Sequence, residues 1–201
     1  MAGRTISRED ALSLQDHKHA CHILLYAETK AKLFGKIPIK QIVLMQMRFD
    51  GLLGFPGGFV KLSEESLEAG LSRELKEEVG VEVPVTLDDY MYSCLAPSPP
   101  RIVLHFYIKK MKEAELIEIE KAAVSNAVDH GLEVLGMVRV PLYTLKNGGG
   151  LSMFLSHSFI SNSRDQLLEA LRHLGLVSSQ TLEEALREAE KRRHKHLTDP
   201  H

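Results

Sequence analysis

Hydrophobic and polar residues follow two different periods along this chain, and together they predict a mixture of strands and helices. Apolar and β-branched runs typical of strands occupy positions 20–27, 41–47, 59–60, 90–95, 102–109 and 133–140. Apolar residues at helical spacing occupy positions 8–14, 63–80, 112–124, 163–174 and 181–196. Because helices and strands alternate, we predict the α/β class, with an α-β-α sandwich around a mixed β-sheet.

The most regular helical pattern lies in residues 63–80. Ser63 is suited to cap the start of this helix, with Glu64 and Glu65 in its first turn, and Gly80 is suited to end it in the left-handed conformation. A stripe of four apolar residues recurs at four-residue intervals and predicts a face buried against the sheet: Leu67, Leu71, Leu75 and Val79.

Three glutamates share the polar face of this predicted helix within one turn: Glu74, Glu77 and Glu78. Like charges at this spacing cost an isolated helix roughly 0.2–0.5 kcal/mol per pair. A shared Mg²⁺ or Mn²⁺ ion would offset that cost, because both ions prefer carboxylate oxygens and bridge them to substrate phosphates. The Gly57-Gly58 pair after Pro56 would let the backbone approach such a ligand closely. The alternative is a solvated acidic face.

Loop and helix together resemble the signature of the Nudix hydrolases, which reads Gly, five residues, Glu, seven residues, then Arg-Glu-aliphatic-x-Glu-Glu-x-Gly-aliphatic. Residues 73–81 match the second half at every position. Six residues separate Gly58 from Glu65, one more than the family pattern, whereas seven separate Glu65 from Arg73. The longer loop leaves open whether Glu64 or Glu65 takes the role of the first acid. The resemblance implies metal-dependent hydrolysis of a phosphoanhydride.

The resemblance also implies a metal site and its supporting residues. Mg²⁺ or Mn²⁺ would be held by the Gly57 carbonyl and by the three helix glutamates, Glu74, Glu77 and Glu78. Arg73 would pair with an acid of the loop and orient it. Glu133, at the start of a late strand, would complete the site or act as the base; an ordinary strand-end glutamate is the alternative.

Six further positions match those with which this family holds a purine base and its phosphate: His22, Arg48, Phe55, Ile160, Asn162 and Gln166. Phe55 could stack on the ring, Asn162 and Gln166 could read its hydrogen-bonding edge, and Arg48 could meet a phosphate with two donors. Asn162 departs from the serine that we expect there. Without the resemblance, Phe55 would be assigned to the core and Arg48 to the surface.

Segments outside the signature resemble one branch of the family, whose vertebrate members decap U8 small nucleolar RNA and hydrolyse inosine diphosphates: 19–26, 42–51, 130–136, 140–145, 158–160 and 166–171. This likeness implies cleavage of RNA caps, of small nucleolar or messenger RNA, with release of methylguanosine diphosphate, and cleavage of (deoxy)inosine diphosphate. It also implies a homodimer in the nucleus and nucleolus, with a cytoplasmic location as the alternative. Two other functions stay open: a general nucleotide pyrophosphatase, and a non-catalytic RNA-binding module like a relative that has lost the acids.

Composition adds limits on domain number and location. With 201 residues, 44% hydrophobic and 26% charged, we expect one domain over residues 1–175, followed by a helical, basic extension over 176–201 that loses order after Arg193. The sequence has neither a long apolar run nor a signal-peptide pattern, so we expect a soluble, intracellular protein without a membrane partner. A net charge of −2 says little about RNA binding. Basic residues gather at 30–40, 109–112 and 191–195, where they would contact an RNA backbone or, as the alternative, form a solubilising face.

Overall fold

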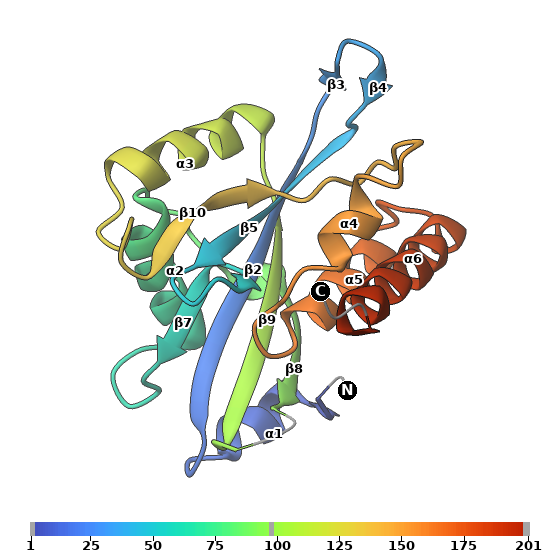
Figure 1. Cartoon of the computed structure of the whole chain (residues 1–201). Helices are drawn as coiled ribbons and strands as arrows, with labels where there is room; N and C mark the ends of the chain where they lie inside the picture. Colours follow the sequence, from blue (N-terminus) through green and yellow to red (C-terminus); the bar gives the residue numbers. More distant parts are fainter. Residues whose placement is uncertain (1–2, 97–98, 199–201) are drawn as a thin grey trace.

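One mixed β-sheet forms the centre of the protein in the computed structural model, which describes residues 3–96 and 99–198. The strand order is β1-β8-β9-β2-β5-β10, with β6 paired to β5 and β7 paired to β2 (Figure 1). β2 and β9 run parallel, and the other pairs of this sheet are antiparallel. The strands are β1 (Thr5–Ile6), β2 (Lys18–Glu28), β5 (Gln41–Arg48), β6 (Leu53–Gly54), β7 (Gly57–Val60), β8 (Tyr90–Leu95), β9 (Ile102–Lys110) and β10 (Val134–Arg139).

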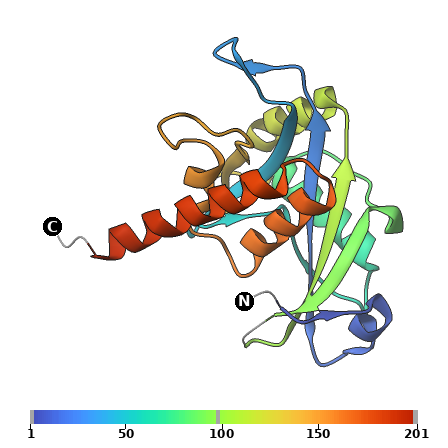
Figure 2. The same cartoon turned by 90° about the vertical axis from the view of Figure 1, so that its right-hand side faces the viewer.

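Helices cover both faces of this sheet (Figures 1 and 2). One face carries α2 (Leu67–Val79) and α3 (Glu113–Ser125), and the other carries α4 (Leu151–Leu155), α5 (Ser163–His173) and α6 (Ser179–Thr198). The short helix α1 (Arg8–Ser13) lies near the start of β2, and a 3-10 turn (Leu87–Asp89) precedes β8. A separate hairpin of β3 (Lys32–Leu33) and β4 (Ile37–Pro38) projects from the opposite end. The predicted α-β-α sandwich is confirmed.

The central strand β2 supplies side chains to two cores, one on each face of the sheet. Cys21, Ile23 and Leu25 are fully buried among residues of α2 and α3, whereas Leu24 is fully buried in the cluster formed with α4, α5 and α6. Successive side chains of a strand point to opposite faces, so a strand covered on both sides is apolar at nearly every position. Full burial of each such side chain contributes roughly 1.5–3 kcal/mol to stability.

Helix α2 has the predicted stripe and the predicted end, but it begins later than predicted. All four stripe residues are buried, and Gly80 ends the helix with φ of 74°. The assignment of Ser63 as the N-cap is wrong, because Ser66 takes that place and its side-chain oxygen accepts a hydrogen bond from the amide of Ala69. The amides of Glu64 and Glu65 donate to the carbonyl of Lys61, so these acids form a turn ahead of the helix.

The C-terminal extension packs on the sandwich. Leu182, Ala185 and Ala189 of α6 are buried in the same cluster as the apolar residues of α5. Helix α6 continues to Thr198, and residues 199–201 lie outside the described part of the chain, so the loss of order after Arg193 stays a prediction. Within that described part, no helix is long and apolar enough to cross a bilayer.

Substitution of Gly80 by alanine tests how the end of α2 is packed. A β-carbon at Gly80 would lie 2.6 Å from the Ala122 carbonyl oxygen and 2.7 Å from the Ala127 nitrogen, both backbone atoms that cannot easily move. Gly131 is a matched control, because its φ of 78° is similar but a β-carbon there meets open space. We expect chemical denaturation to show a loss of about 1 kcal/mol for Gly131→Ala and at least about 2 kcal/mol for Gly80→Ala. Equal losses would contradict the packing argument.

Candidate active site

Glu78 is a buried carboxylate that links three elements of the structure. Glu78 lies near the end of α2 and is only 6% exposed. Gln46 of β5 donates a hydrogen bond from Nε2 to Glu78 Oε1 at 3.0 Å, and the amide of Gly57 in β7 donates to Oε2 at 2.6 Å. Hydrogen bonds to a charged acceptor are among the strongest in proteins, so this residue fixes the glycine loop against the helix.

Burial and neighbouring charges change the acidity of this cluster. Burial, above all, raises the pKa of Glu78 to about 7, and the charges of Glu74 and Asp129 act in the same direction against the two hydrogen bonds. Burial also raises the pKa of Glu74, although its contact with Arg73 opposes the change. The pKa of Asp129 is raised by burial and by the charges of Glu133 and Glu77. The structure therefore gathers these acids into one electrostatically coupled group.

Arg73 is the cation that neutralises the outer part of this group. Its guanidinium lies 2.7 Å from Glu74 and 3.5 Å from Glu77, and it makes two hydrogen bonds to Glu65 at 2.8 and 3.3 Å. The predicted pairing of Arg73 with an acid of the loop is confirmed, and its partner is Glu65. Glu64 instead lies 3.6 Å from Lys61, with both side chains largely exposed. The extra residue of the loop is thus accommodated without moving Glu65 away from the helix.

The carboxylate oxygens of this cluster are suitable ligands for a hard divalent cation. In the present side-chain conformations they do not converge on one point. Within the described residues, no three acidic, histidine or cysteine side chains converge as a metal site. The reason is that Arg73 holds Glu74 and Glu77, while Gln46 and Gly57 hold both oxygens of Glu78. Carboxylate oxygens beside a glycine backbone still form the set that Mg²⁺ and Mn²⁺ prefer. Glu74 lies directly against Gly58, in the space that a side chain there would fill.

Asp129 and Gln46 belong to this cluster but not to the set predicted from the sequence, whereas Glu133 was predicted. Asp129 follows α3; its amide donates to the carbonyl of Glu77 at 3.3 Å, and its charge acts on Glu78. Glu133 is exposed and lies near Asp129, at the rim of the cluster. Gln46 had a usable signal, a polar residue inside an apolar strand, whereas Asp129 had none, because loop residues carry no periodic pattern.

Three of the six residues predicted to bind the base and its phosphate lie around β2, β5 and β6. His22 pairs with Gly57 across the strands, and burial together with the charge of Arg48 lowers its pKa to about 4. Arg48 contacts Asp50, with an Nη2–Oδ2 distance of 3.1 Å. The side chains of Arg48 and Ile160 both flank Gly54, where an added β-carbon would lie 3.1 Å from each. The structure therefore brings His22, Arg48 and Ile160 to one side of the glycine loop.

The other three residues of that set are buried. Phe55 is 2% exposed and packs on Phe106 with ring centroids 5.1 Å apart, so its faces are largely covered. Asn162, at the start of α5, donates to Cys94 Sγ at 3.4 Å. Gln166 is 2% exposed, and its Nε2 has no hydrogen-bond partner among the described residues. A buried unpaired donor is costly, so a ligand acceptor at this point would be favoured.

The acidity of Glu78 predicts an unusual dependence of stability on pH. Its folded pKa of about 7 lies above the ordinary value of 4.5, so its contribution to stability is fully present below pH 4.5 and is lost as the pH rises through 7. With a chelator present, we expect the free energy of unfolding of the wild type to fall by about 3 kcal/mol relative to Glu78→Gln between these limits. Urea titrations at several pH values measure this difference. Glu82→Gln, which removes an exposed acid, should keep the wild-type dependence.

Sequence comparisons match the chain to one family model and identify two kinds of related protein. The family model described as Nudt16-like, U8 snoRNA-decapping enzyme-like, matches residues 19–177. The U8 snoRNA-decapping enzyme of Xenopus laevis is 54% identical over 92% of this chain and 88% of that protein. The Tudor-interacting repair regulator protein of Homo sapiens is 47% identical over 96% of this chain and 92% of that protein.

A solved structure supports the same assignment at the level of the fold. The NUDIX domain of Shewanella oneidensis NrtR, solved in complex with ADP ribose, superposes with a TM-score of 0.53 over 84% of this chain and 99% of that domain. Its sequence identity is 18%, so it shows the architecture alone. Fold, signature helix and family match agree: the chain belongs to the Nudt16-like, U8 snoRNA-decapping enzyme-like family of Nudix proteins.

Proposed function

We propose that this protein is a metal-dependent Nudix hydrolase that cleaves the phosphoanhydride of RNA caps and releases methylguanosine diphosphate. The observation that carries the proposal is the acidic cluster of α2 held against the Gly57-Gly58 loop through Glu78. Relatives named as U8 snoRNA-decapping enzymes, at 53–55% identity in three vertebrates, support capped RNA as the substrate.

The chain's own residues would position the substrate and control the charge around it. A Mg²⁺ or Mn²⁺ ion held by Glu74, Glu77, Glu78 and the Gly57 carbonyl would neutralise the phosphates and acidify the attacking water. The water oxygen would bond to a phosphorus of the anhydride while a carboxylate of the cluster accepts the water proton, and the bridging oxygen would leave on the other product, so that methylguanosine diphosphate separates from RNA bearing a 5′-monophosphate. Arg73 would keep Glu65 aligned at the mouth of the loop.

The buried polar residues beside the glycine loop support binding of a purine base. His22 lies opposite Gly57 across β2 and β7, Asn162 and Gln166 are buried polar residues at the start of α5, and the Gln166 Nε2 has no partner among the described residues. Because its pKa is lowered, His22 is neutral near pH 7 and can either donate or accept. This chemistry suits an oxo-purine edge, so we include (deoxy)inosine diphosphate among the proposed substrates.

A second candidate function is a non-catalytic binding module. The relatives named Tudor-interacting repair regulator, at 47–48% identity, favour it, because the name describes a partner instead of a reaction. The retained acids Glu74, Glu77 and Glu78 favour the enzyme, since their mutual repulsion has no evident use in a module without a metal.

We also propose a homodimer and a nuclear and nucleolar location, both from the family likeness. Light scattering on the purified chain would test the dimer through its mass. Microscopy of the tagged full chain would test the location. A purely cytoplasmic signal would favour a general role in hydrolysing unwanted nucleotides or caps.

Removal of the Glu78 charge is the main test of the proposed reaction. We expect purified wild type to release methylguanosine diphosphate from cap-labelled RNA with Mg²⁺ or Mn²⁺, and to lose the activity with chelator. Glu78→Gln should lower kcat by about 100-fold or more, because the site loses its central carboxylate. The same assay on inosine diphosphate tests the second substrate. No turnover of either substrate, with RNA still bound, would replace the enzyme with the binding module.

The two loop acids give a matched pair of variants. Glu65 contacts Arg73, whereas the neighbouring Glu64 contacts an exposed lysine. We expect Glu65→Gln to lower kcat/KM by about 10- to 100-fold through loss of positioning, and Glu64→Gln to leave it near the wild-type value. Steady-state kinetics on one capped RNA decides between them. The reverse order would mean that Glu64 turns toward the metal when substrate binds.

A further inference from the structure

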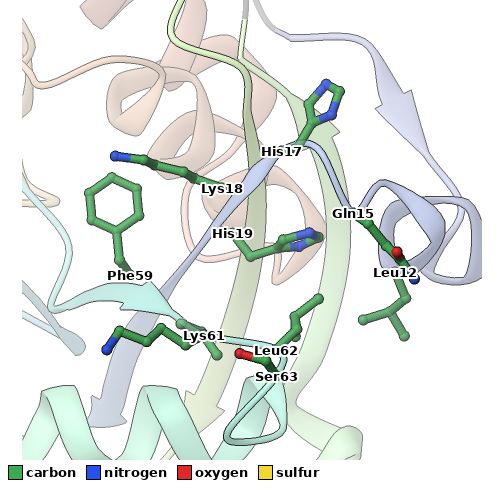
Figure 3. Close-up of a pocket in the computed structure, with 10 residues that line it drawn as sticks. Leu12, Gln15, His17, Lys18, His19, Phe59, Lys61, Leu62 and Ser63 are labelled. Carbon is green, nitrogen blue, oxygen red and sulfur yellow. The ribbon is translucent and has the colours of Figure 1, made fainter.

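A groove of about 800 Å³ lies at the edge of the sheet, where His19 and Val60 line it on the α2 face and Lys18 and Phe59 line it on the opposite face (Figure 3). Its wall is made by the first residues of β2, the end of β7, the loop that follows β7, and the segment around α1. We call it the Lys18–Lys61 groove, after the two lysines that lie at it. In Figure 3 the Lys18 ammonium and the Phe59 ring lie next to each other, with Lys61 on the same side of the view. None of the residues assigned above to metal or base lines it.

Strand register connects this groove to the residues predicted to bind the base. Ala20 lies directly opposite Phe59 across β2 and β7, and His22 lies directly opposite Gly57. Directly opposite residues of neighbouring strands share a face, as do residues two apart along one strand. Lys18, Phe59 and His22 therefore lie on one face of the sheet. Along this face, starting from His22, the next of these side chains is Phe59, and Lys18 follows it.

The lining has the chemistry of a surface that binds single-stranded nucleic acid. Phe59 is 53% exposed, and Lys18 Nζ lies 5.6 Å from its ring centroid. Among the ten lining residues, all within the described chain, Lys18, Phe59 and Lys61 supply two cations and one exposed ring on the same side of the view in Figure 3, and no lining residue carries a carboxylate. Lys61 has a contact with Glu64 at 3.6 Å, but both side chains are so exposed that the pair is weak. Both ammonium groups are thus available to phosphates.

The groove also touches the catalytic loop directly. Phe59 follows Gly58, against which the Glu74 carboxylate lies, and its carbonyl accepts a hydrogen bond from Arg73 at 3.3 Å. A strand advances about 3.3 Å per residue, so Phe59 lies roughly 7 Å beyond Gly57 along the chain. A polymer with its cap at the acidic cluster would need only a short step to reach this ring.

We propose that the Lys18–Lys61 groove binds the ribonucleotides that follow the cap, with a base stacked on Phe59 and phosphates against Lys18 and Lys61. Stacking on an exposed aromatic ring between cations accepts any base, which suits the body of an RNA whose cap is read elsewhere. The identification of the ligand as capped RNA rests on the proposed function. The groove itself predicts affinity for single-stranded RNA whether or not the protein cleaves a cap.

The test compares a triple variant of the groove with a matched triple variant elsewhere. Phe59→Ala, Lys18→Ala and Lys61→Ala together remove one exposed ring and two lysines. Phe34→Ala, Lys32→Ala and Lys36→Ala remove the same groups from the β3–β4 hairpin, where Phe34 is 78% exposed. All six side chains are exposed or half-exposed, so we expect both proteins to fold, and circular dichroism would confirm it. Phe59→Tyr keeps an aromatic ring and should retain binding.

Binding is measured first, by fluorescence anisotropy with uncapped single-stranded RNA at several salt concentrations. We expect the groove variant to bind about 10-fold or more weakly than wild type. Its plot of log K against log salt should be less steep by about 1.4, because two phosphate contacts are lost. The hairpin variant should match wild type. Absence of RNA binding by wild type, or an equal loss in both variants, would overturn the proposal.

Turnover is measured second, as the ratio of kcat/KM for a capped RNA of several nucleotides to that for a cap dinucleotide. We expect the groove variant to lower this ratio about 10-fold. If wild type cleaves neither substrate, the proposed function fails, and the binding measurement alone decides the groove. If the groove variant changes the mass in light scattering but not RNA affinity, the surface is an interface between copies and the proposal is wrong.

Discussion

The hydrogen bonds to the buried Glu78 carboxylate connect the parts of the site that would otherwise be independent. A carboxylate removed from water is costly unless donors replace its hydration; here the Gly57 amide and the Gln46 side chain offset part of that cost, and burial still raises the pKa. Since the donors come from β7 and β5 and the acceptor from α2, any shift of one element leaves a buried group unpaired. The position of the glycine loop is therefore determined by the packing of the apolar stripe of α2, and not by the short sequence of the loop itself.

The sheet separates two kinds of chemistry. Acids of α2 approach the glycine loop from one side of β7, as the contact between Glu74 and Gly58 shows. His22, Phe59 and Lys18 lie on the opposite face, toward α5. The two sides approach each other near Gly57 and Gly58, where no side chain intervenes. If RNA binds as proposed, its diphosphate and its polymer would be held from opposite faces of the sheet.

Features that repeat along the sequence could be predicted, and features that depend on long-range geometry could not. The α2 stripe and the Gly80 end are local, periodic signals, and the sandwich follows from their alternation with strands. Ser63 and Ser66 are equally good caps by residue type, so the sequence could not decide where the helix begins. Asp129 lies near the acids of α2 because the segment after α3 packs against that helix. Neither residue spacing nor composition predicts this contact. The sequence allowed Phe55 either to stack on a base or to lie in the core. Its packing against Phe106 makes it a core residue in this conformation.

Helix α6 shows that the region matched by the family ends before the hydrophobic core does. The family match ends at residue 177, yet Leu182, Ala185 and Ala189 fill the core beyond it. The Arg193 side chain also donates to the Ser156 and His157 carbonyls at the end of α4. A shortened chain that stops where the family match stops would leave the α4–α5 surface uncovered, with apolar side chains open to water. Recombinant fragments of this protein should therefore retain α6, even when the purpose is to study the signature helix alone.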